Sequence, residues 1–350
     1  MIDIIPEIMG EVEYQRYSVV EDRINLFTNS EVIGVDESGV FDMYAIHLGN
    51  TNKPTIYFQS SIHGSEWKTT QYGLSFFEKL RDDSYPNKNF RDLLLENFHL
   101  VYVPVVNPYG YDQPLDETGE QIRKDGRENV NGIDLNRNFD DRTEQETKNI
   151  ISVIEQYNPI ACIDMHLRTV KGSNLELHSS HYETEHVREK IATMWQNYTG
   201  ETLVVNSVSG SSDPSLWDRG LFINYVRNNI ENPYTPYTLA YLTEIGQYDN
   251  REGGNTNRET YNYGMSSLYA FLFNVINYYI EYNEDFSFNG DTGQVYKVQH
   301  EHKTIYLFRD LSGKLIRLKE VYEWGTVILT TIKRDQDDNI VEYIRKKFDE

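Results

Sequence analysis

The chain has 350 residues, of which 39% are hydrophobic and 13% aromatic, and its formal net charge is −22 at pH 7. Length and composition predict a globular protein with a large core, built as one large domain or as one domain with an appendage, and they exclude an extensively disordered chain. The acidic excess argues against nucleic acid and against anionic membranes as general partners, because both attract basic surfaces.

Neither a secretory signal nor a membrane span is predicted. The segment 1–15 lacks a basic region followed by a long apolar stretch, so the expected location is the cytoplasm, although release by lysis would leave the same sequence. The most apolar late segment, residues 268–280, is too short and too interrupted by polar residues to cross a bilayer. The single cysteine, Cys162, lies in an apolar run, which predicts a small buried side chain and no internal disulfide.

Hydrophobic periodicity and turn residues predict alternating strands and helices over residues 30–282. In chain order we expect a helix over 12–28, strands over 31–35 and 43–48, a strand that begins at Ile56, helices over 67–80 and 90–97, a strand over 100–106, a helix over 144–157, a strand over 160–165, a helix over 183–198, a strand over 237–245 and a helix over 260–279. This alternation predicts an α/β domain with a mixed, largely parallel central sheet flanked by helices.

The sequence changes in character after residue 283. Short β-rich runs over 294–299, 304–308, 314–318, 326–332 and 340–345 are joined by turns that contain Gly and Asp. We therefore expect a larger α/β domain over residues 1–283 and a small all-β C-terminal appendage over residues 284–350. The sequence predicts no partner for this appendage.

Four predicted strands end in polar residues of the kinds that carry chemistry. His63 and Glu66 follow the strand from Ile56 in His-x-x-Glu spacing, and the ends of three later strands carry Asn107, His166 and Glu244. Because the carboxyl ends of parallel strands meet at one edge of a sheet, we expect these side chains to gather there. Each of them alone would be an ordinary polar residue at a strand end.

This group of side chains suits a zinc ion. Catalytic zinc takes three protein ligands with nitrogen or oxygen donors, keeps one position open for water, and needs a nearby carboxylate to move protons. His63, Glu66 and His166 supply two imidazoles and one carboxylate. Glu244 supplies a fourth group, which is either a further ligand or a general base.

Five sequence blocks carry a resemblance to a known family. In chain order they are His63-Gly64-Ser65-Glu66-Trp67, Asn107-Pro108-Tyr109-Gly110-Tyr111, Asp134-Leu135-Asn136-Arg137-Asn138-Phe139, His166 and Glu244. In this combination and order they resemble the zinc metallocarboxypeptidases of the carboxypeptidase A type, and the resemblance covers roughly residues 10–282. It implies a zinc carboxypeptidase-like catalytic domain over residues 1–283.

The resemblance implies one Zn²⁺ ion per chain. Its ligands would be His63, Glu66 and His166, and Glu244 would act as general base and then as general acid. This assignment agrees with the chemistry, because zinc lowers the pKa of a bound water so that a carboxylate can deprotonate it near neutral pH.

The resemblance also implies a binding site for the terminal carboxylate of the substrate, formed by Asn136 and Arg137. A guanidinium fork beside an amide donor is well suited to a carboxylate; otherwise these residues would simply form a turn that caps the following helix. A further arginine of the family stabilises the tetrahedral oxyanion. Arg127 and Arg123 both lie in the matching loop, and Arg127 is favoured.

The chain departs from the family pattern in the loop that carries a mobile substrate-capping tyrosine. Trp217 occupies that position here, and an indole offers an N–H donor but no phenol. Trp217 is therefore expected to line the substrate site, the alternative being an aromatic residue of the core. Either Tyr225, Tyr234 or Tyr237 supplies the missing hydroxyl, or the enzyme handles substrates without it. The interval between Arg137 and His166 is shorter than in digestive carboxypeptidases, which predicts a more open cleft.

These features predict a hydrolase, a zinc-dependent metallocarboxypeptidase that cleaves the C-terminal amide bond of peptides with a free terminal carboxylate. One alternative within the same chemistry is a peptidase for bacterial cell-wall stem peptides with D- or γ-linked residues. Another is an N-acyl amino acid deacylase. Outside the enzyme class, the alternative is an inactive binding or structural protein that keeps the fold.

Overall fold

The structure is a computed structural model that describes residues 13–113, 126–168, 175–179, 184–200, 203–207, 220–246 and 257–283, together with five later strands. The chain forms two compact units, and each is described by itself. One unit comprises Met1–Pro86 and Leu95–Asn283, and the other comprises Asn87–Leu94 and Glu284–Glu350.

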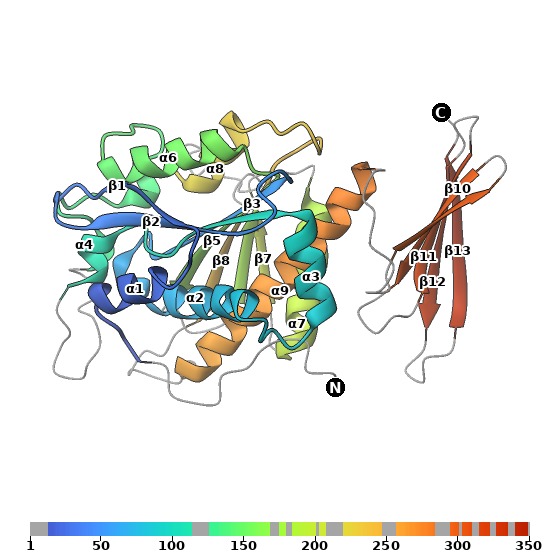
Figure 1. Ribbon diagram of the computed structural model, residues 1–350, viewed down its shortest axis with the longest axis horizontal. Helices are drawn as coiled ribbons and strands as arrows, with labels where there is room; N and C mark the ends of the chain where they lie inside the picture. Colours follow the sequence, from blue (N-terminus) through green and yellow to red (C-terminus); the bar gives the residue numbers. More distant parts are fainter. Residues whose placement is uncertain are drawn as a thin grey trace. The chain divides into compact units, whose positions relative to one another are not determined.

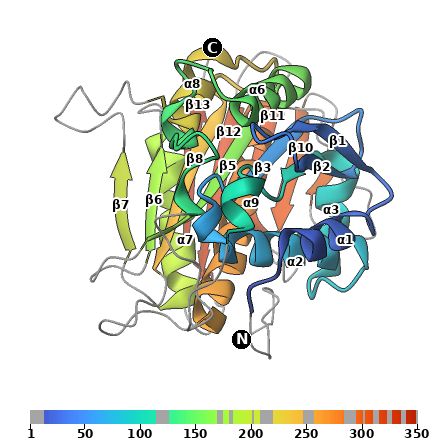
Figure 2. The ribbon, with the colours of Figure 1, turned by 90° about the vertical axis from the view of Figure 1, so that its left-hand side faces the viewer.

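An eight-stranded sheet forms the centre of the larger unit, in the order β1-β2-β4-β3-β5-β8-β6-β7 (Figure 2). Its strands are β1 (Ser30–Val35), β2 (Asp42–Gly49), β3 (Thr55–Ser60), β4 (His99–Val103), β5 (Ala161–Arg168), β6 (Leu175–Ser179), β7 (Leu203–Ser207) and β8 (Leu239–Gly246). The four central strands β4, β3, β5 and β8 are parallel to one another, whereas β2 joins β4 and β6 joins β8 in antiparallel fashion. The predicted mixed, largely parallel sheet is confirmed.

Helices cover both faces of this sheet. The described helices of the chain are α1 (Tyr17–Ile24), α2 (Lys68–Arg81), α3 (Lys88–Asn97), α4 (Pro108–Tyr111), α6 (Gln145–Tyr157), α7 (Glu185–Thr199), α8 (Phe222–Asn229) and α9 (Asn257–Tyr282), with short 3₁₀ turns η1 (Gly64–Glu66) and η2 (Leu135–Arg137). Figure 1 shows α6 and α8 on one face and α2, α7 and α9 on the other. Within the described ranges, no helix combines the length and the apolar character needed to cross a membrane.

Burial on both faces explains the composition of the central strands. Every position of β3 is buried, and seven of the eight positions of β5 are buried, so both strands read as nearly continuous apolar runs. On the α6 and α8 side, Tyr57 and Cys162 belong to one apolar cluster with Ile150 and Phe222. Cys162 is a free, buried thiol, as the sequence predicted.

The structure also differs from the predicted elements. Helix α1 begins at Tyr17, and β5 continues past His166, so this residue lies inside the strand and does not follow it. Strand β8 begins at Leu239 and contains Glu244, as predicted. The sequence did not predict β6, β7 or α8. These elements have five, five and eight residues, which is too short for a clear periodic pattern.

Five antiparallel strands form the sheet of the smaller unit, in the order β13-β12-β11-β10-β9. They are β9 (Val295–His300), β10 (Lys303–Arg309), β11 (Leu315–Tyr322), β12 (Val327–Arg334) and β13 (Ile340–Phe348). Each of the five predicted β-rich runs corresponds to one of these strands. Neighbours in the sequence are neighbours in the sheet, as expected for a meander with short turns.

Candidate metal centre

The turn after β3 holds His63 and Glu66 in place. Ser61, which directly follows β3, has φ +48°, a left-handed conformation that is uncommon for a residue with a side chain. Its backbone N–H donates to Thr69 Oγ1 at 3.0 Å, and its hydroxyl lies 2.8 Å from Thr70 Oγ1. These contacts with the first turn of α2 offset the local strain, so the chain leaves the sheet in a fixed direction.

Two of the sequence blocks pack backbone against backbone at this turn. A Cβ atom added to Gly64 would lie 2.1 Å from the carbonyl carbon of Gly110, so only glycine fits there. Asn107 caps the short helix α4, because its Oδ1 accepts from Gly110 N–H at 2.9 Å. Its amide nitrogen donates to the carbonyl of Arg127 at 3.3 Å. The block that begins at Asn107 therefore supports both the His-x-x-Glu turn and the segment that carries Arg127.

His63, Glu66 and His166 form one buried cluster. Nδ1 of His63 lies 2.9 Å from Glu66 Oε1, and Nδ1 of His166 lies 3.1 Å from Glu66 Oε2. One ligand atom from each residue lies within 4.8 Å of the other two. The backbone N–H of Leu167 donates to Glu66 Oε2 at 3.0 Å and fixes the carboxylate against β5.

The opposite ring nitrogens of the two histidines face carboxylates. Nε2 of His63 lies 3.0 Å from Asp134 Oδ1, and Nε2 of His166 lies 2.8 Å from Asp164 Oδ2. Arg127 donates through Nη2 to Asp134 Oδ2 at 2.7 Å, and its Nη1 lies 3.3 Å from His63 Nδ1. The Nδ1 atoms are thus the ring atoms that point into the cluster.

Negative charge dominates the cluster. Burial lowers the pKa of His63, but the carboxylates of Glu66 and Asp134 outweigh burial and raise that pKa above its usual value. Burial likewise opposes the charged form of His166, yet Asp164 and Glu66 raise the pKa of this histidine well above its usual value. Burial also works against ionised Glu66, but the two imidazoles hold the pKa of this carboxyl well below its usual range. A site with this field attracts a cation.

The cluster fits a zinc ion. Two imidazole nitrogens and one carboxylate are the donor set of several catalytic zinc sites, and the carboxylates behind both rings fix their orientation. His166 Nδ1 is buried and lies 3.1 Å from Glu66 Oε2, yet among the described residues it makes no hydrogen bond of normal geometry, which is unusual for a polar atom in a protein interior. A metal ion would satisfy this atom, and His63, Glu66 and His166 are the residues that would hold it.

Glu244 lies beside the cluster on β8. It pairs in register with His166 of β5, so the two residues are neighbours across the parallel strands. Its Oε2 is buried and has no hydrogen-bond partner among the residues that the structure describes. Burial, with a contribution from the charge of Glu66, raises the pKa of Glu244 to about 7 despite the opposing effect of His166. This carboxyl can therefore take up and release a proton near neutral pH.

Asn136 and Arg137 lie on the 3₁₀ turn η2 at the same site. Asn136 is buried; its Oδ1 accepts from the backbone N–H of Phe222 at 3.0 Å, and its Nδ2 lies 3.4 Å from His166 Nε2. Arg137 is exposed and donates through Nη1 to the carbonyl of Asn136. The structure brings these residues to the cluster, and their role in holding a substrate carboxylate stays a prediction.

Two predicted substrate-binding tyrosines are placed elsewhere, which corrects the sequence analysis. Tyr225 is buried in the core on α8, and its hydroxyl donates to Glu155 Oε1 at 2.7 Å. Tyr237 precedes the amino end of β8, whereas Glu244 lies near the carboxyl end, about 20 Å away at the usual rise per strand residue. Neither tyrosine can cover a substrate at the cluster. Tyr234 likewise precedes the amino end of β8. The remaining predictions, Arg123 and Trp217, lie outside the described residues.

Asp164 is a functional residue that was not predicted from the sequence. Asp164 stands two residues before His166 in β5, and residues two apart in a strand share a face. This spacing was a usable signal. Its apolar neighbours in the sequence predict a buried strand and give no indication that the carboxylate has a functional role.

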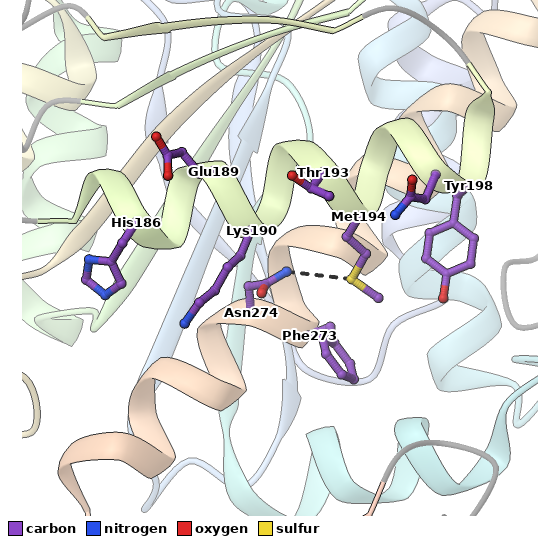
Figure 3. Close-up of a pocket in the computed structure, with 9 residues that line it drawn as sticks. His186, Glu189, Lys190, Thr193, Met194, Tyr198, Phe273 and Asn274 are labelled. Carbon is purple, nitrogen blue, oxygen red and sulfur yellow. Dashed lines mark hydrogen bonds between the residues drawn. The ribbon is translucent and has the colours of Figure 1, made fainter. Parts of the chain in front are cut away.

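A separate groove of about 850 Å³ lies on the outer side of α7 and α9 (Figure 3). Residues of these two helices line it, among them His186, Lys190 and Phe273. Its lining includes none of the residues predicted for the metal site, so the groove is separate from that site.

Comparison with known proteins identifies a family model that matches residues 41–283 and is described as zinc carboxypeptidase. Among individual proteins, metallocarboxypeptidase A of Trichophyton tonsurans is 30% identical over 149 residues, which cover 38% of this chain and 35% of the relative. Human carboxypeptidase D is 28% identical over 121 residues, 33% of this chain and 9% of the relative. The match thus spans about a third of the length of the first of these relatives.

Solved structures show the same fold. Carboxypeptidase A from Helicoverpa armigera superposes with a TM-score of 0.59 at 15% identity, covering 78% of this chain and 75% of the other. A metallo-carboxypeptidase from Burkholderia cenocepacia superposes with a TM-score of 0.58 at 14% identity, covering 76% and 70%. At this level of identity the comparison concerns the fold alone.

Proposed function

The chain belongs to the zinc carboxypeptidase family, and we propose that it is a zinc-dependent peptidase that hydrolyses the C-terminal amide bond of a peptide with a free terminal carboxylate. One observation carries this proposal. Two imidazole Nδ1 atoms and the Glu66 carboxylate converge on one buried point, and Glu244 lies on the adjacent strand.

His63, Glu66 and His166 would hold the metal. A bound zinc ion supplies Lewis acidity and makes water a nucleophile near neutral pH. Asp134 and Asp164 keep the two imidazoles oriented with Nδ1 toward that ion.

Glu244 is suited to proton transfer. Burial raises the pKa of Glu244 to about 7 in the metal-free site, and a nearby cation would favour its ionised form, so it can accept a proton from the attacking water and return it to the leaving amine. The unpartnered Oε2 atom is available for this exchange. Positioned proton transfer of this kind typically contributes 10²–10⁴-fold in rate, roughly.

Arginines supply the positive charge that an anionic substrate and transition state need. Arg127 is fixed by Asp134 at the rim of the cluster, with its side chain 34% exposed, and can stabilise the developing oxyanion. Exposed Arg137 can bind the terminal carboxylate in bidentate fashion, with the amide of Asn136 beside it. Removing one such donor to an oxyanion typically costs about 3–4 kcal/mol of transition-state stabilisation.

The test combines metal analysis with a substrate panel. Zinc content is measured on the purified protein, and turnover is measured on blocked dipeptides, on stem peptides with D- or γ-linked residues, and on N-acyl amino acids. Glu244→Gln is compared with Glu189→Gln, which changes an exposed carboxylate on α7. We expect one zinc per chain, turnover of at least one peptide, a loss of about 10³-fold in Glu244→Gln, and no change in Glu189→Gln.

Two results would contradict the proposal. A wild-type protein that binds no zinc, and in which His63 and His166 can be replaced without effect, is not a zinc enzyme. Zinc binding with turnover confined to N-acyl amino acids would instead identify a deacylase.

A further inference from the structure

A chain of hydrogen-bonded side chains lies buried behind His166. The Tyr57 hydroxyl donates to Gln59 Oε1 at 3.1 Å, and Gln59 Nε2 donates to Asp164 Oδ1 at 2.9 Å. Asp164 Oδ2 lies 2.8 Å from His166 Nε2. Tyr57, Gln59 and Asp164 are fully buried, and His166 is 1% exposed, so the chain is shielded from bulk solvent.

Strand register brings these four residues together. β3 and β5 are parallel neighbours in which Gln59 is paired with Asp164 and Tyr57 with Cys162. Residues two apart in a strand share a face, so Tyr57 and Gln59 lie on the same face as Asp164 and His166. This is the face that packs against α6 and α8, where Tyr57 and Cys162 belong to the apolar cluster.

A carboxylate in such a layer needs partners on both oxygens. Burying a charge without hydrogen bonds costs several kcal/mol, roughly, so the partners of Asp164 are structural requirements. The amide N–H of Gln59 donates to one oxygen of the Asp164 carboxylate, and Nε2 of His166 contacts the other. In the described part of the chain these are the two partners recorded for this carboxylate.

The direction of the hydrogen bonds runs one way. Tyr57 donates to Gln59, so the carbonyl oxygen of the amide faces the tyrosine and the amide nitrogen faces Asp164. Both oxygens of the Asp164 carboxylate are hydrogen-bond acceptors. Nε2 of His166 must therefore carry the proton that it donates to Asp164. The amide nitrogen of Asn136 is also 3.4 Å from Nε2, but it is a donor at a longer distance and does not compete for that proton.

A proton on Nε2 leaves Nδ1 as the ring atom that can bind a metal. Nδ1 is buried 3.1 Å from Glu66 Oε2 and makes no hydrogen bond of normal geometry within the described part of the chain. We infer that Asp164, supported by Gln59 and Tyr57, is a positioning residue that fixes the tautomer and orientation of His166 and thereby sets the affinity of the site for its metal. This inference rests on the proposed function in that it needs the cluster to bind zinc.

The measurement is zinc affinity, obtained by competition with a chromophoric chelator, alongside the melting temperature of the metal-free protein. Asp164→Leu removes the acceptor and leaves Nε2 buried without a partner. Asp164→Asn keeps a neutral acceptor if Gln59 reorients, and Gln59→Leu removes only the support. Partners of this kind change metal affinity by about 10–100-fold, so we expect affinity to fall in the order wild type, Gln59→Leu, Asp164→Asn, Asp164→Leu.

The matched control is Glu146→Gln, since Glu146 is also fully buried but accepts its hydrogen bond from Asn129, away from the cluster. It should keep wild-type zinc affinity. Proton–nitrogen spectra of the histidine rings in the zinc-loaded wild type should show a proton on Nε2 of His166. If Asp164→Leu misfolds, Asp164→Asn and Gln59→Leu carry the test.

The outcomes separate the two claims. Zinc affinity in the folded Asp164 variants within threefold of the wild type would overturn the inference and leave the proposed function intact. A loss of affinity in Glu146→Gln equal to that in Asp164→Asn would also overturn it, because burial alone would then explain the effect. A wild type without zinc affinity would overturn the proposed function itself.

Discussion

Asp134 Oδ1 lies 3.0 Å from Nε2 of His63, on the side of the ring opposite Glu66. The other oxygen of the same carboxylate accepts from Arg127 at 2.7 Å. One side chain thus orients a metal ligand and an arginine at the same time, and the pKa of Asp134 is held well below its usual range against the effect of burial. Removing its charge should affect both partners.

Asp134→Asn should lower zinc affinity by about 10–100-fold and lower kcat/KM at saturating zinc as well, because Arg127 loses its anchor. Chelator competition measures the first effect, and kinetics with excess zinc measures the second. Asp141→Asn, an exposed aspartate near the same turn, should change neither quantity. If Asp134→Asn keeps the zinc affinity and the kcat/KM of the wild type, the contacts of Asp134 with His63 and Arg127 do not contribute to metal binding or catalysis.

Metal removal should destabilise the larger unit reversibly. A ligand that binds only the native state stabilises it by about 2.7 kcal/mol at a free concentration one hundred times its Kd. A strong chelator should therefore lower the melting temperature, and added zinc should restore it. His63→Ala and His166→Ala should show no such response, and a chelator effect of equal size in these variants would mean that the ion binds elsewhere.

Gly64→Ala should disrupt the site through the backbone. The added methyl would lie 2.1 Å from the carbonyl carbon of Gly110, so the turn that carries His63 and Glu66 must move. We expect a loss of about 3 kcal/mol in the free energy of unfolding, measured with denaturant, together with weaker zinc binding. Gly200→Ala has φ +71° but open space, so it reports the conformational cost alone, about 1 kcal/mol, with zinc binding unchanged.

A histidine pair away from the metal should make stability depend on pH. His47 Nδ1 and His99 Nε2 lie 3.0 Å apart, and burial together with His47 lowers the pKa of His99 to about 4. In the unfolded chain this pKa is near 6.5, so between these values the unfolded state binds more protons. The free energy of unfolding should therefore fall by an amount on the order of 2 kcal/mol as the pH drops from about 6.5 to 4.

His99→Gln is the variant that isolates this effect. Glutamine keeps donors and an acceptor near Thr55 and His47 but does not titrate in this range. The difference in unfolding free energy between wild type and variant should shrink as the pH falls below 6.5. A constant difference across the range would assign the pH dependence to other groups.

Tyr225→Phe tests the corrected placement of that tyrosine. Its hydroxyl donates to Glu155, an exposed residue of α6, so its loss should cost about 1 kcal/mol of stability and leave kcat/KM unchanged. Thermal unfolding and kinetics on the same preparation decide the point. A large drop in kcat with stability preserved would instead show that Tyr225 acts at the substrate site.

Local patterns predicted the parts of the fold that have strong local signals. The alternation of apolar strands with amphipathic helices was sufficient for β1, β2, β3, β4, β5 and β8 of the central sheet but not for β6 and β7. The His-x-x-Glu turn after β3 was expected to lie at the carboxyl edge of this sheet. The partners that complete the site depend on register between strands far apart in the chain. Gln59 and Asp164 are 105 positions apart, so their contact cannot be predicted from the local sequence around either residue.

The misassigned tyrosines show a related limit. Tyr225 and Tyr237 were judged by residue type and by their nearness in sequence to the loop of Trp217. Their positions are decided by α8, a short helix that the sequence did not reveal, and by the direction in which β8 runs. A residue at the amino end of a parallel strand is on the wrong edge of the sheet, however close it lies in sequence to the functional loop.

Because His166 and Glu244 lie inside β5 and β8, in the middle of the sheet, their backbone amides should exchange with solvent only when the whole sheet opens. His63 and Glu66 instead sit on a single 3₁₀ turn, which can open without disturbing the strands. The position of His166 and Glu244 is thus as stable as the fold itself. His63 and Glu66 can move away from them by local unfolding of the turn. Release of the metal should therefore begin from the turn, at a rate set by local opening and well above the rate of global unfolding.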